Sequence, residues 1–166
     1  MRDTLVCADE AGDPLRPSIL WLDTRKDPGD WRPSPWQRLA HGLSGMTRSV
    51  EKSLADGKVN WIRRNDPQVW QATRHALLVS GFLTMRLTGT ATDSIAAMVG
   101  HIPVDYRRGE WGGPGVLTAQ LFPIEGDKRY PLIPPGSPAG AVRGGASRHT
   151  AIPEGTPVVA AGSDKA

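Results

Sequence analysis

Residues 156–164 read TPVVAAGSD, a short apolar run followed by a glycine, a serine and an aspartate. The run at 156–161 predicts a buried strand, because small and β-branched apolar residues are bounded there by proline and glycine. In α/β folds the functional groups lie just beyond the carboxyl ends of such strands. Asp164 stands at that position and is therefore a candidate for a catalytic carboxylate.

The rest of the chain alternates short strand-like segments with helical ones. Residues 4–8 and 18–22 predict two strands, joined by a turn at 10–14 into an antiparallel hairpin. Ser34-Pro35 and Asp66-Pro67 are typical of helix starts, with a capping residue before a proline. Three more helices are predicted near 58–64, 82–87 and 116–122, the second capped by Ser80 and closed by Gly89. An apolar run lies at 75–79, and Trp61 and Trp70 are predicted to fill the core. This mixture predicts an α/β fold without an internal repeat.

Length and composition narrow the class of protein. The chain has 166 residues, enough for one domain with its own core. Its 19 glycines and 15 prolines exceed the usual share of roughly 12%, which indicates many turns rather than a helical bundle. The N-terminus has no apolar signal segment, and no apolar run approaches the roughly 18 residues of a membrane span. We therefore expect a cytoplasmic protein, and the single cysteine, Cys7, excludes an internal disulfide.

The charges of the chain are spread rather than clustered. It has 20 Lys and Arg against 17 Asp and Glu, a net charge of +3, and its basic residues form no group larger than pairs such as Arg63-Arg64. A nucleic-acid-binding protein concentrates its basic residues in a patch or stripe. We therefore expect partners that are neither nucleic acid nor membrane.

Several standard sites are absent from the sequence. It contains no phosphate-binding loop or dinucleotide-binding fingerprint of the Walker or Rossmann type, and its four histidines are too scattered for a zinc site. Three carboxylates remain at segment ends: Asp23, Asp93 and Asp164. For Asp23 and Asp93 the alternative is a helix cap, because aspartate is a preferred N-cap residue.

The order of several motifs resembles the first domain of the FGGY carbohydrate kinases, the group that includes glycerol kinase and xylulokinase. The resemblance covers essentially the whole chain, and no single motif decides it. The motifs are AGDPLRPSILWLDTR at 11–25, GKVNWI at 57–62, RLTG at 86–89, ATDS at 91–94 and PVVAAGSD at 157–164.

The resemblance implies an activity and a set of site residues. The family has two actin-like, ribonuclease H-like α/β domains and moves the γ-phosphoryl group of ATP, with Mg²⁺, to a sugar or polyol hydroxyl in the cleft between them. Asp164 matches its general base, and Trp21 matches an aromatic residue on which the carbon face of the polyol packs. Arg2, Asp93 and Ser94 match positions near the sugar. For Trp21 the alternative is plain core packing. Family members are often homo-oligomers.

The chain also departs from the family pattern. It has no residues that match the opening Asp-x-Gly-Thr phosphate loop, and none that match the ATP-binding second domain. Ser94 stands where glycerol kinase has a tyrosine, which leaves the identity of the sugar open. We therefore expect 1–166 to be a partial N-terminal, sugar-binding domain without its own cofactor or metal site, inactive and marginally stable alone. The alternative is a degenerate, non-catalytic domain that binds a polyol weakly.

Overall fold

The computed structural model describes residues 4–20, 22–27, 29, 32–43, 45, 47–98, 102–113, 118–119 and 122–162. In chain order the elements are β1 (Leu5–Ala8), α1 (Pro35–Leu43), α2 (Thr47–Asp56), α3 (Lys58–Asn65), α4 (Pro67–Ala72), β2 (His75–Leu78), α5 (Val79–Thr88), β3 (Asp93–Ser94), η1 (Ile95–Ala97), β4 (Val104–Asp105), β5 (Glu110–Trp111), η2 (Gly126–Lys128), β6 (Leu132–Ile133), β7 (Pro138–Ala141), α7 (Gly144–Thr150) and β8 (Pro157–Val159). The fold is a mixture of helices and strands, as the sequence predicts. Most of the predicted helix at 116–122 lies outside the described residues. None of the described helices combines the length and the apolar character needed to cross a membrane.

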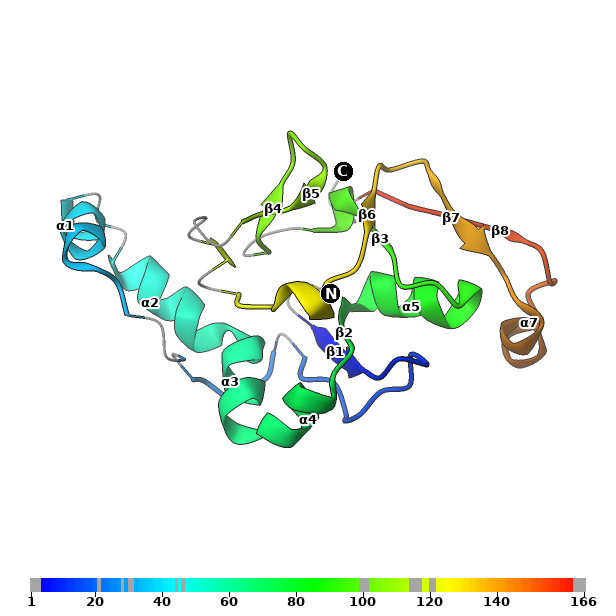
Figure 1. Cartoon of the computed structure of the whole chain (residues 1–166), viewed down its shortest axis with the longest axis horizontal. Helices are drawn as coiled ribbons and strands as arrows, with labels where there is room; N and C mark the ends of the chain where they lie inside the picture. Colours follow the sequence, from blue (N-terminus) through cyan, green and yellow to red (C-terminus); the bar gives the residue numbers. More distant parts are fainter. Residues whose placement is uncertain are drawn as a thin grey trace.

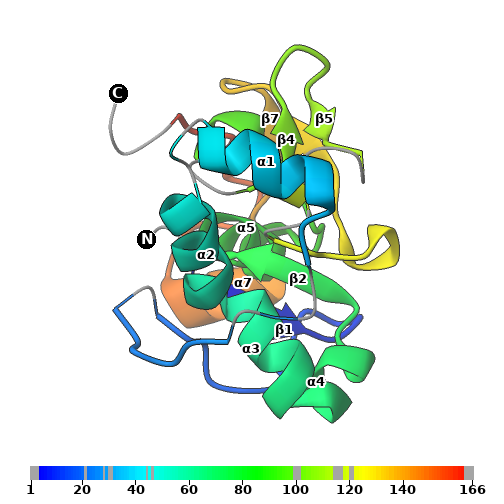
Figure 2. The same ribbon diagram turned by 90° about the vertical axis from the view of Figure 1, so that its left-hand side faces the viewer.

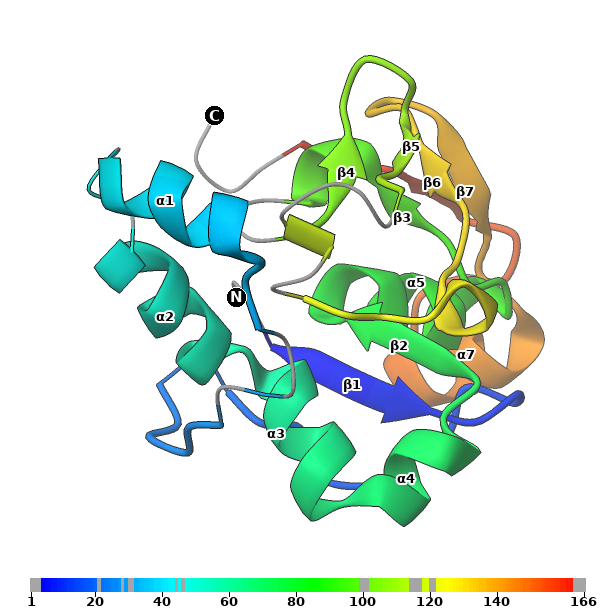
Figure 3. The ribbon, with the colours of Figure 1, turned by 60° about the vertical axis from the view of Figure 1, so that its left-hand side comes forward.

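The described strands are arranged in pairs. β1 and β2 run antiparallel, with Leu5 opposite Leu78 and Ala8 opposite His75, and they lie side by side in the middle of the molecule (Figure 1, Figure 3). β3 pairs with β6 in parallel, whereas β4–β5 and β7–β8 are antiparallel. Figure 1 places α1 and α2 at one end of the molecule and β7, β8 and α7 at the other.

α5 joins the central strand pair to the outer elements. It packs against β1, β2, β3, β7, β8 and α7, and Figure 2 shows it behind α1 and α2 when the molecule is viewed from that end. The helix ends where Gly89 adopts a left-handed backbone with φ of 82° and donates its amide to the carbonyl of Met85 at 2.8 Å. Gly89 therefore closes this helix as the sequence predicts.

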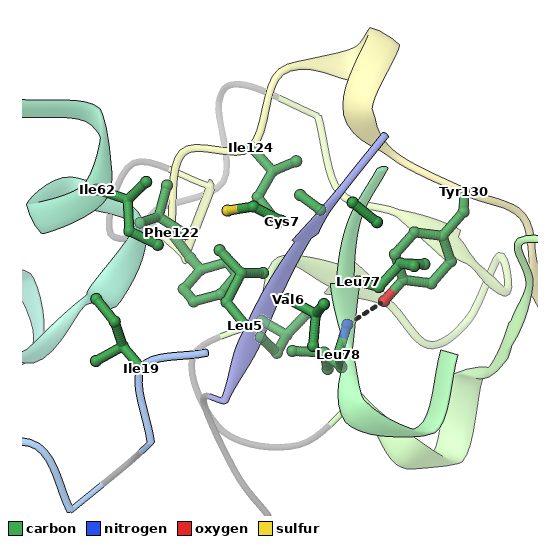
Figure 4. Close-up of a cluster of buried hydrophobic side chains, with 14 of the residues drawn as sticks. Leu5, Val6, Cys7, Ile19, Ile62, Leu77, Leu78, Phe122, Ile124 and Tyr130 are labelled. Atoms are coloured by element: carbon green, nitrogen blue, oxygen red, sulfur yellow. Dashed lines mark hydrogen bonds between the residues drawn. The ribbon is translucent and has the colours of Figure 1, made fainter. Parts of the chain in front are cut away.

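The core surrounds β1, whose four residues are all buried, the thiol of Cys7 included. Figure 4 shows Ile62 and Phe122 on one side of the β1–β2 pair and Tyr130 on the other. Burial on both faces explains why both strands are continuous apolar runs. Trp70 is buried as predicted, and Trp61 packs partly buried against this core.

α1 begins at the predicted cap. The Ser34 hydroxyl accepts the amide N–H of Gln37 at 3.3 Å, and the side-chain oxygen of Gln37 accepts the amide of Ser34 at 2.8 Å. This reciprocal pair satisfies two amides that the first turn of a helix leaves free. α4 also begins at the predicted proline, Pro67, but Asp66 makes no side-chain cap hydrogen bond. Its carboxylate instead lies 3.0 Å from the guanidinium of Arg16.

The predicted strand at 18–22 is wrong for its described residues, 18–20 and 22, none of which belongs to a regular strand. Pro14 and Ile19 make isolated antiparallel bridges to β1, so the described residues from 14 to 20 follow β1 in the predicted antiparallel direction but form no ladder with it. Pro14 and Pro17 have no N–H to donate, which prevents a continuous set of strand hydrogen bonds. β1 takes β2 as its regular partner instead.

The predicted strand near the end of the chain forms, but it is not buried. β8 pairs with β7 in a two-stranded ribbon, and Val159 is 54% exposed. A two-stranded ribbon has too few layers to bury both faces of a strand. The prediction that 156–161 is a buried strand is therefore wrong for the described residues.

Ser80 is not the cap that the sequence predicts for the helix after it. α5 already begins at Val79, with Leu78 in the cap position, so Ser80 lies within the first turn. Its hydroxyl donates to the carboxylate of Asp93, a contact described below.

Gly12→Ala is expected to lower the free energy of unfolding by about 1–3 kcal/mol, because left-handed backbone is strained for alanine. Gly12 has φ of 85°, and a Cβ atom there would lie 2.9 Å from Cε of the buried Met85. The matched control is Gly136→Ala, where φ is 84° and no atom lies within 4 Å. Urea unfolding followed by circular dichroism measures both variants. Equal losses would contradict a cost for the Met85 contact.

Candidate functional site

Asp93 lies at the junction of β3 and α5, and its carboxylate is buried. Oδ2 accepts the hydroxyl hydrogen of Ser80 at 2.6 Å, and Oδ1 accepts the amide of Ser94 at 2.8 Å. The amide of Gly81 also donates to this carboxylate. The side chain therefore receives hydrogen bonds from both α5 and β3 and holds these two elements together.

Burial raises the pKa of Asp93, and the hydrogen bonds from Ser80, Ser94 and Gly81 oppose that rise. Two of these donors, the Ser80 hydroxyl and the Gly81 amide, belong to the first turn of α5. Amides in the first turn have no partner within the helix, and the helix dipole favours an anion there. Gly81 is suited to this close approach, because a Cβ atom there would lie 3.2 Å from Oδ2 of Asp93. Asp93 thus binds the N-terminus of α5 from outside the helix.

Tyr130 closes this group on the side of the central strands. Its hydroxyl oxygen accepts the amide of Leu78 at 3.2 Å (Figure 4). Burial and then the nearby charge of Asp93 raise the pKa of the phenol. The ring of Trp111 meets the Tyr130 ring edge-on at 5.4 Å, and its indole nitrogen donates to the Tyr130 carbonyl. These contacts keep the phenol neutral and fixed.

Ser94 is also buried, next to Asp93 in β3. Its hydroxyl accepts the amide of Ala96 at 3.3 Å, so Ser94 is the N-cap of η1. The alternative of a helix cap therefore applies to Ser94 rather than to Asp93.

Asp23 lies in a second group of polar residues, beside α3. Arg25 donates two side-chain hydrogen bonds to its carboxylate, at 2.8 and 2.6 Å, and its amide donates a third at 2.8 Å. These hydrogen bonds hold the pKa of Asp23 well below its usual range. The next described helix begins at Pro35, so the alternative that Asp23 caps a helix is wrong.

Sequence reasoning missed two residues that organise these groups, Ser80 and Lys58. The sequence predicts Ser80 as a helix cap, whereas its hydroxyl donates a hydrogen bond to Asp93. Lys58 is buried, and its ammonium donates to the carbonyls of Asp23 and Arg25. A lysine is rarely buried, and no local pattern in the sequence marks Lys58 as an exception.

The predicted site residues are described only in part. Asp93 and Ser94 are adjacent, whereas Arg2, Trp21 and Asp164 lie outside the described residues. Within the described ranges no three His, Cys, Asp or Glu side chains are grouped so as to hold a metal ion. The described residues place one buried, hydrogen-bonded carboxylate at β3 and a second group of hydrogen-bonded polar residues at 22–27.

Comparison with known proteins finds xylulose kinases and a glycerol kinase among the relatives of this chain. A xylulose kinase of Bacillus subtilis (strain 168) is 26% identical over 163 residues, which is 98% of this chain and 32% of that protein. A crystal structure of xylulose kinase from Rhodospirillum rubrum matches with a TM-score of 0.70 at 24% identity, over 98% of this chain and 33% of that one. Plasmodium falciparum glycerol kinase with ADP matches with a TM-score of 0.67 at 16% identity, over 99% of this chain and 33% of that one.

These matches show the fold and the extent of the likeness. The chain spans about a third of the length of these relatives, and it shares the α/β fold of the corresponding part of the sugar kinases. The model of the FGGY family of carbohydrate kinases, N-terminal domain, matches residues 1–166. The chain therefore belongs to the FGGY family of carbohydrate kinases.

Proposed function

We propose that this chain is the sugar-binding part of a kinase that transfers the γ-phosphoryl group of ATP to a hydroxyl of a sugar or polyol. The observation that carries the proposal is the match of the family model to all of 1–166. The fold proposed for it is the first of two actin-like, ribonuclease H-like domains, with the adenosine-binding surface outside these residues.

Each candidate residue has a role in this proposal. Asp164 accepts the proton of the attacking hydroxyl, and Trp21 packs against the carbon face of the sugar. Arg2 and Ser94 lie at its polar side. The oxygens of Asp93 already accept three protein hydrogen bonds, so Asp93 acts by holding Ser94 in place. The buried, adjacent positions of Asp93 and Ser94 support this arrangement.

In this proposal the chain contributes two things to phosphoryl transfer: it positions the sugar hydroxyl, and it provides one general base. Phosphoryl transfer depends mainly on alignment and on stabilisation of charge at the transferring group. A carboxylate beside the hydroxyl orients it and takes its proton, while ATP and Mg²⁺ supply the phosphoryl group and neutralise its charge. We assign no magnesium ligand to this chain.

The proposal predicts sugar binding without catalysis by the 166-residue chain. Titration calorimetry with D-xylulose and with glycerol is expected to show weak binding of one of them, abolished by Trp21→Ala. The matched control is Trp36→Ala on α1, whose ring is 79% exposed and which is expected to leave binding unchanged. Absence of binding by the unmodified chain, or equal binding by Trp21→Ala, would contradict the proposal.

ADP release in the presence of ATP, Mg²⁺ and sugar is expected to be undetectable for the chain alone, because preorganised phosphate donors are missing from its motifs. ADP release that is lost in Asp164→Asn would show instead that the chain carries a whole active site. The alternative of a non-catalytic domain predicts a different result. The chain would bind a polyol, but no longer protein that contains it would release ADP.

A further inference from the structure

The carboxylate of Asp93 connects the start of α5 to the segment that carries Ser94. Oδ2 accepts the hydroxyl hydrogen of Ser80 at 2.6 Å, and Oδ1 accepts the amide of Ser94 at 2.8 Å. These two hydrogen bonds use different oxygens of one planar group, so a rotation of the carboxylate affects both. Ser80 is therefore coupled to Ser94 through Asp93, although Ser80 and Asp93 lie 13 residues apart in the sequence.

The backbone of this segment is held from the opposite side by β6. The amide of Asp93 donates to the carbonyl of Pro131 at 3.2 Å, and β3 pairs with β6 in parallel. From α5 the donors are the Ser80 hydroxyl and the Gly81 amide. The Gly81 contact is made by the backbone, whereas the Ser80 contact needs a side chain with a hydroxyl. Position 80 is thus where the choice of amino acid decides how α5 holds Asp93.

The hydroxyl of Ser94 is oriented by its own neighbours. Its oxygen accepts the amide of Ala96 at 3.3 Å, which fixes it at the start of η1. A serine hydroxyl has one hydrogen besides its lone pairs, and in the proposed site that hydrogen is donated to an oxygen of the sugar. The side chain is buried, which leaves little tolerance for a shift of the backbone that carries it.

The charge of Asp93 is unfavourable for stability unless hydrogen bonds compensate for its burial. An uncharged side chain of similar size would fill the same space without that cost, so packing alone does not account for an aspartate here. What the charge adds is a fixed geometry, since charge-assisted hydrogen bonds are short and strong. The 2.6 Å contact with Ser80 is of this kind.

We propose that Ser80 is a positioning residue of the sugar site, which orients the carboxylate of Asp93 and thereby the backbone and hydroxyl of Ser94. This inference rests on the proposed function for the role of Ser94, whereas the connection from Ser80 through Asp93 to Ser94 rests on the described contacts alone.

The test compares Ser80→Ala with Ser80→Thr, which keeps a hydroxyl, and with Ser147→Ala, the same change at a half-buried serine of α7. Calorimetry measures the affinity for D-xylulose, and NMR measures hydrogen exchange at the amides of Ser94 and Ala96. Ser80→Ala is expected to weaken affinity and to speed both exchange rates, each by about tenfold, the effect of losing a hydrogen bond to a charged group. Ser80→Thr is expected to keep most of the affinity, and Ser147→Ala all of it.

The pH dependence of affinity distinguishes positioning through Asp93 from a general loss of packing. The carboxylate is surrounded by the Ser80 hydroxyl, the Gly81 and Ser94 amides and the phenol of Tyr130. Burial raises the pKa of the phenol, so the phenol stays neutral when the carboxylate titrates. Burial also raises the pKa of Asp93, and the Ser80 hydrogen bond opposes that rise. Without that bond the carboxylate loses its charge at a higher pH, and the affinity of Ser80→Ala is expected to fall at a higher pH on acidification than that of wild type.

Unchanged exchange at Ser94 in Ser80→Ala would overturn the connection, and faster exchange with unchanged affinity would overturn its role in the site. The same holds for a loss of affinity that Ser80→Thr does not restore or that leaves the pH dependence unshifted. If Ser80→Ala does not fold, Ser80→Cys replaces it, because a thiol is a weaker donor than a hydroxyl; wild-type affinity in that variant would overturn the inference. Failure of the proposed function is seen separately, as a wild-type chain that binds no D-xylulose.

Discussion

Phe122→Ala is expected to lower the free energy of unfolding by about 3–5 kcal/mol. The ring is 2% exposed and lies beside Leu5, Ile19 and Ile62 in the core (Figure 4). Its removal leaves a cavity between β1, the segment bridged to it and α3, elements that do not follow one another in the chain. Such a loss is a large part of the roughly 5–15 kcal/mol that a typical domain has.

Chemical unfolding in urea, followed by circular dichroism, measures this effect. The control is Trp36→Ala, which removes a larger aromatic ring that is 79% exposed and is expected to change stability by less than about 0.5 kcal/mol. Similar losses in the two variants would show that the cluster around Phe122 is not the stabilising core.

Asp93→Asn is expected to remove a pH dependence from the stability of the protein. Burial raises the pKa of Asp93 in the folded state above its ordinary value of 3.8, so the folded protein keeps a proton there that the unfolded chain has lost. The stabilisation is fully present below the ordinary pKa and is lost as pH rises through the folded pKa. The asparagine amide does not titrate.

The advantage of wild type over Asp93→Asn is therefore expected to shrink as pH rises, by up to about 1.4 kcal/mol per pH unit within the window between the two pKa values. Urea unfolding of both proteins between about pH 3 and pH 7 measures it. Asp127→Asn, at a side chain that is 72% exposed, serves as the control. A difference between wild type and Asp93→Asn that is independent of pH would contradict a raised pKa.

Local features of the fold could be predicted where local chemistry decides them. Ser34 marks the start of α1 because its hydroxyl bonds to an amide three residues on, and Gly89 ends α5 because its own backbone turns left-handed. Both signals depend on neighbours in the sequence.

Strand pairing and burial could not be predicted in the same way. Segment 18–22 has the composition of a strand, yet β1 pairs regularly with β2, and the apolar run of β8 lies in an exposed ribbon. Pairing depends on which edges the whole fold leaves free, and this is not recorded in any short window of sequence.

In the candidate site, too, some features could be predicted from the local sequence and others depend on packing. The positions of Asp93 and Ser94 at a segment end were visible in the sequence, whereas the partner of Asp93 on α5 was not. Lys58 bonds to carbonyls 35 and 33 residues away, and that contact exists only after α3 has packed. Arg2, Trp21 and Asp164 remain predictions from the family resemblance.

Because the thiol in β1 is buried, the rate at which it reacts measures how often the core opens. Cys7 is the only cysteine of the chain, is 1% exposed, and has its pKa raised by burial. A thiol reagent can therefore modify it only when the central strands separate, and the rate of labelling reports how often they do. For the same reason, a disulfide between the Cys7 residues of two chains in a stored sample would show that the central strands of those molecules had separated.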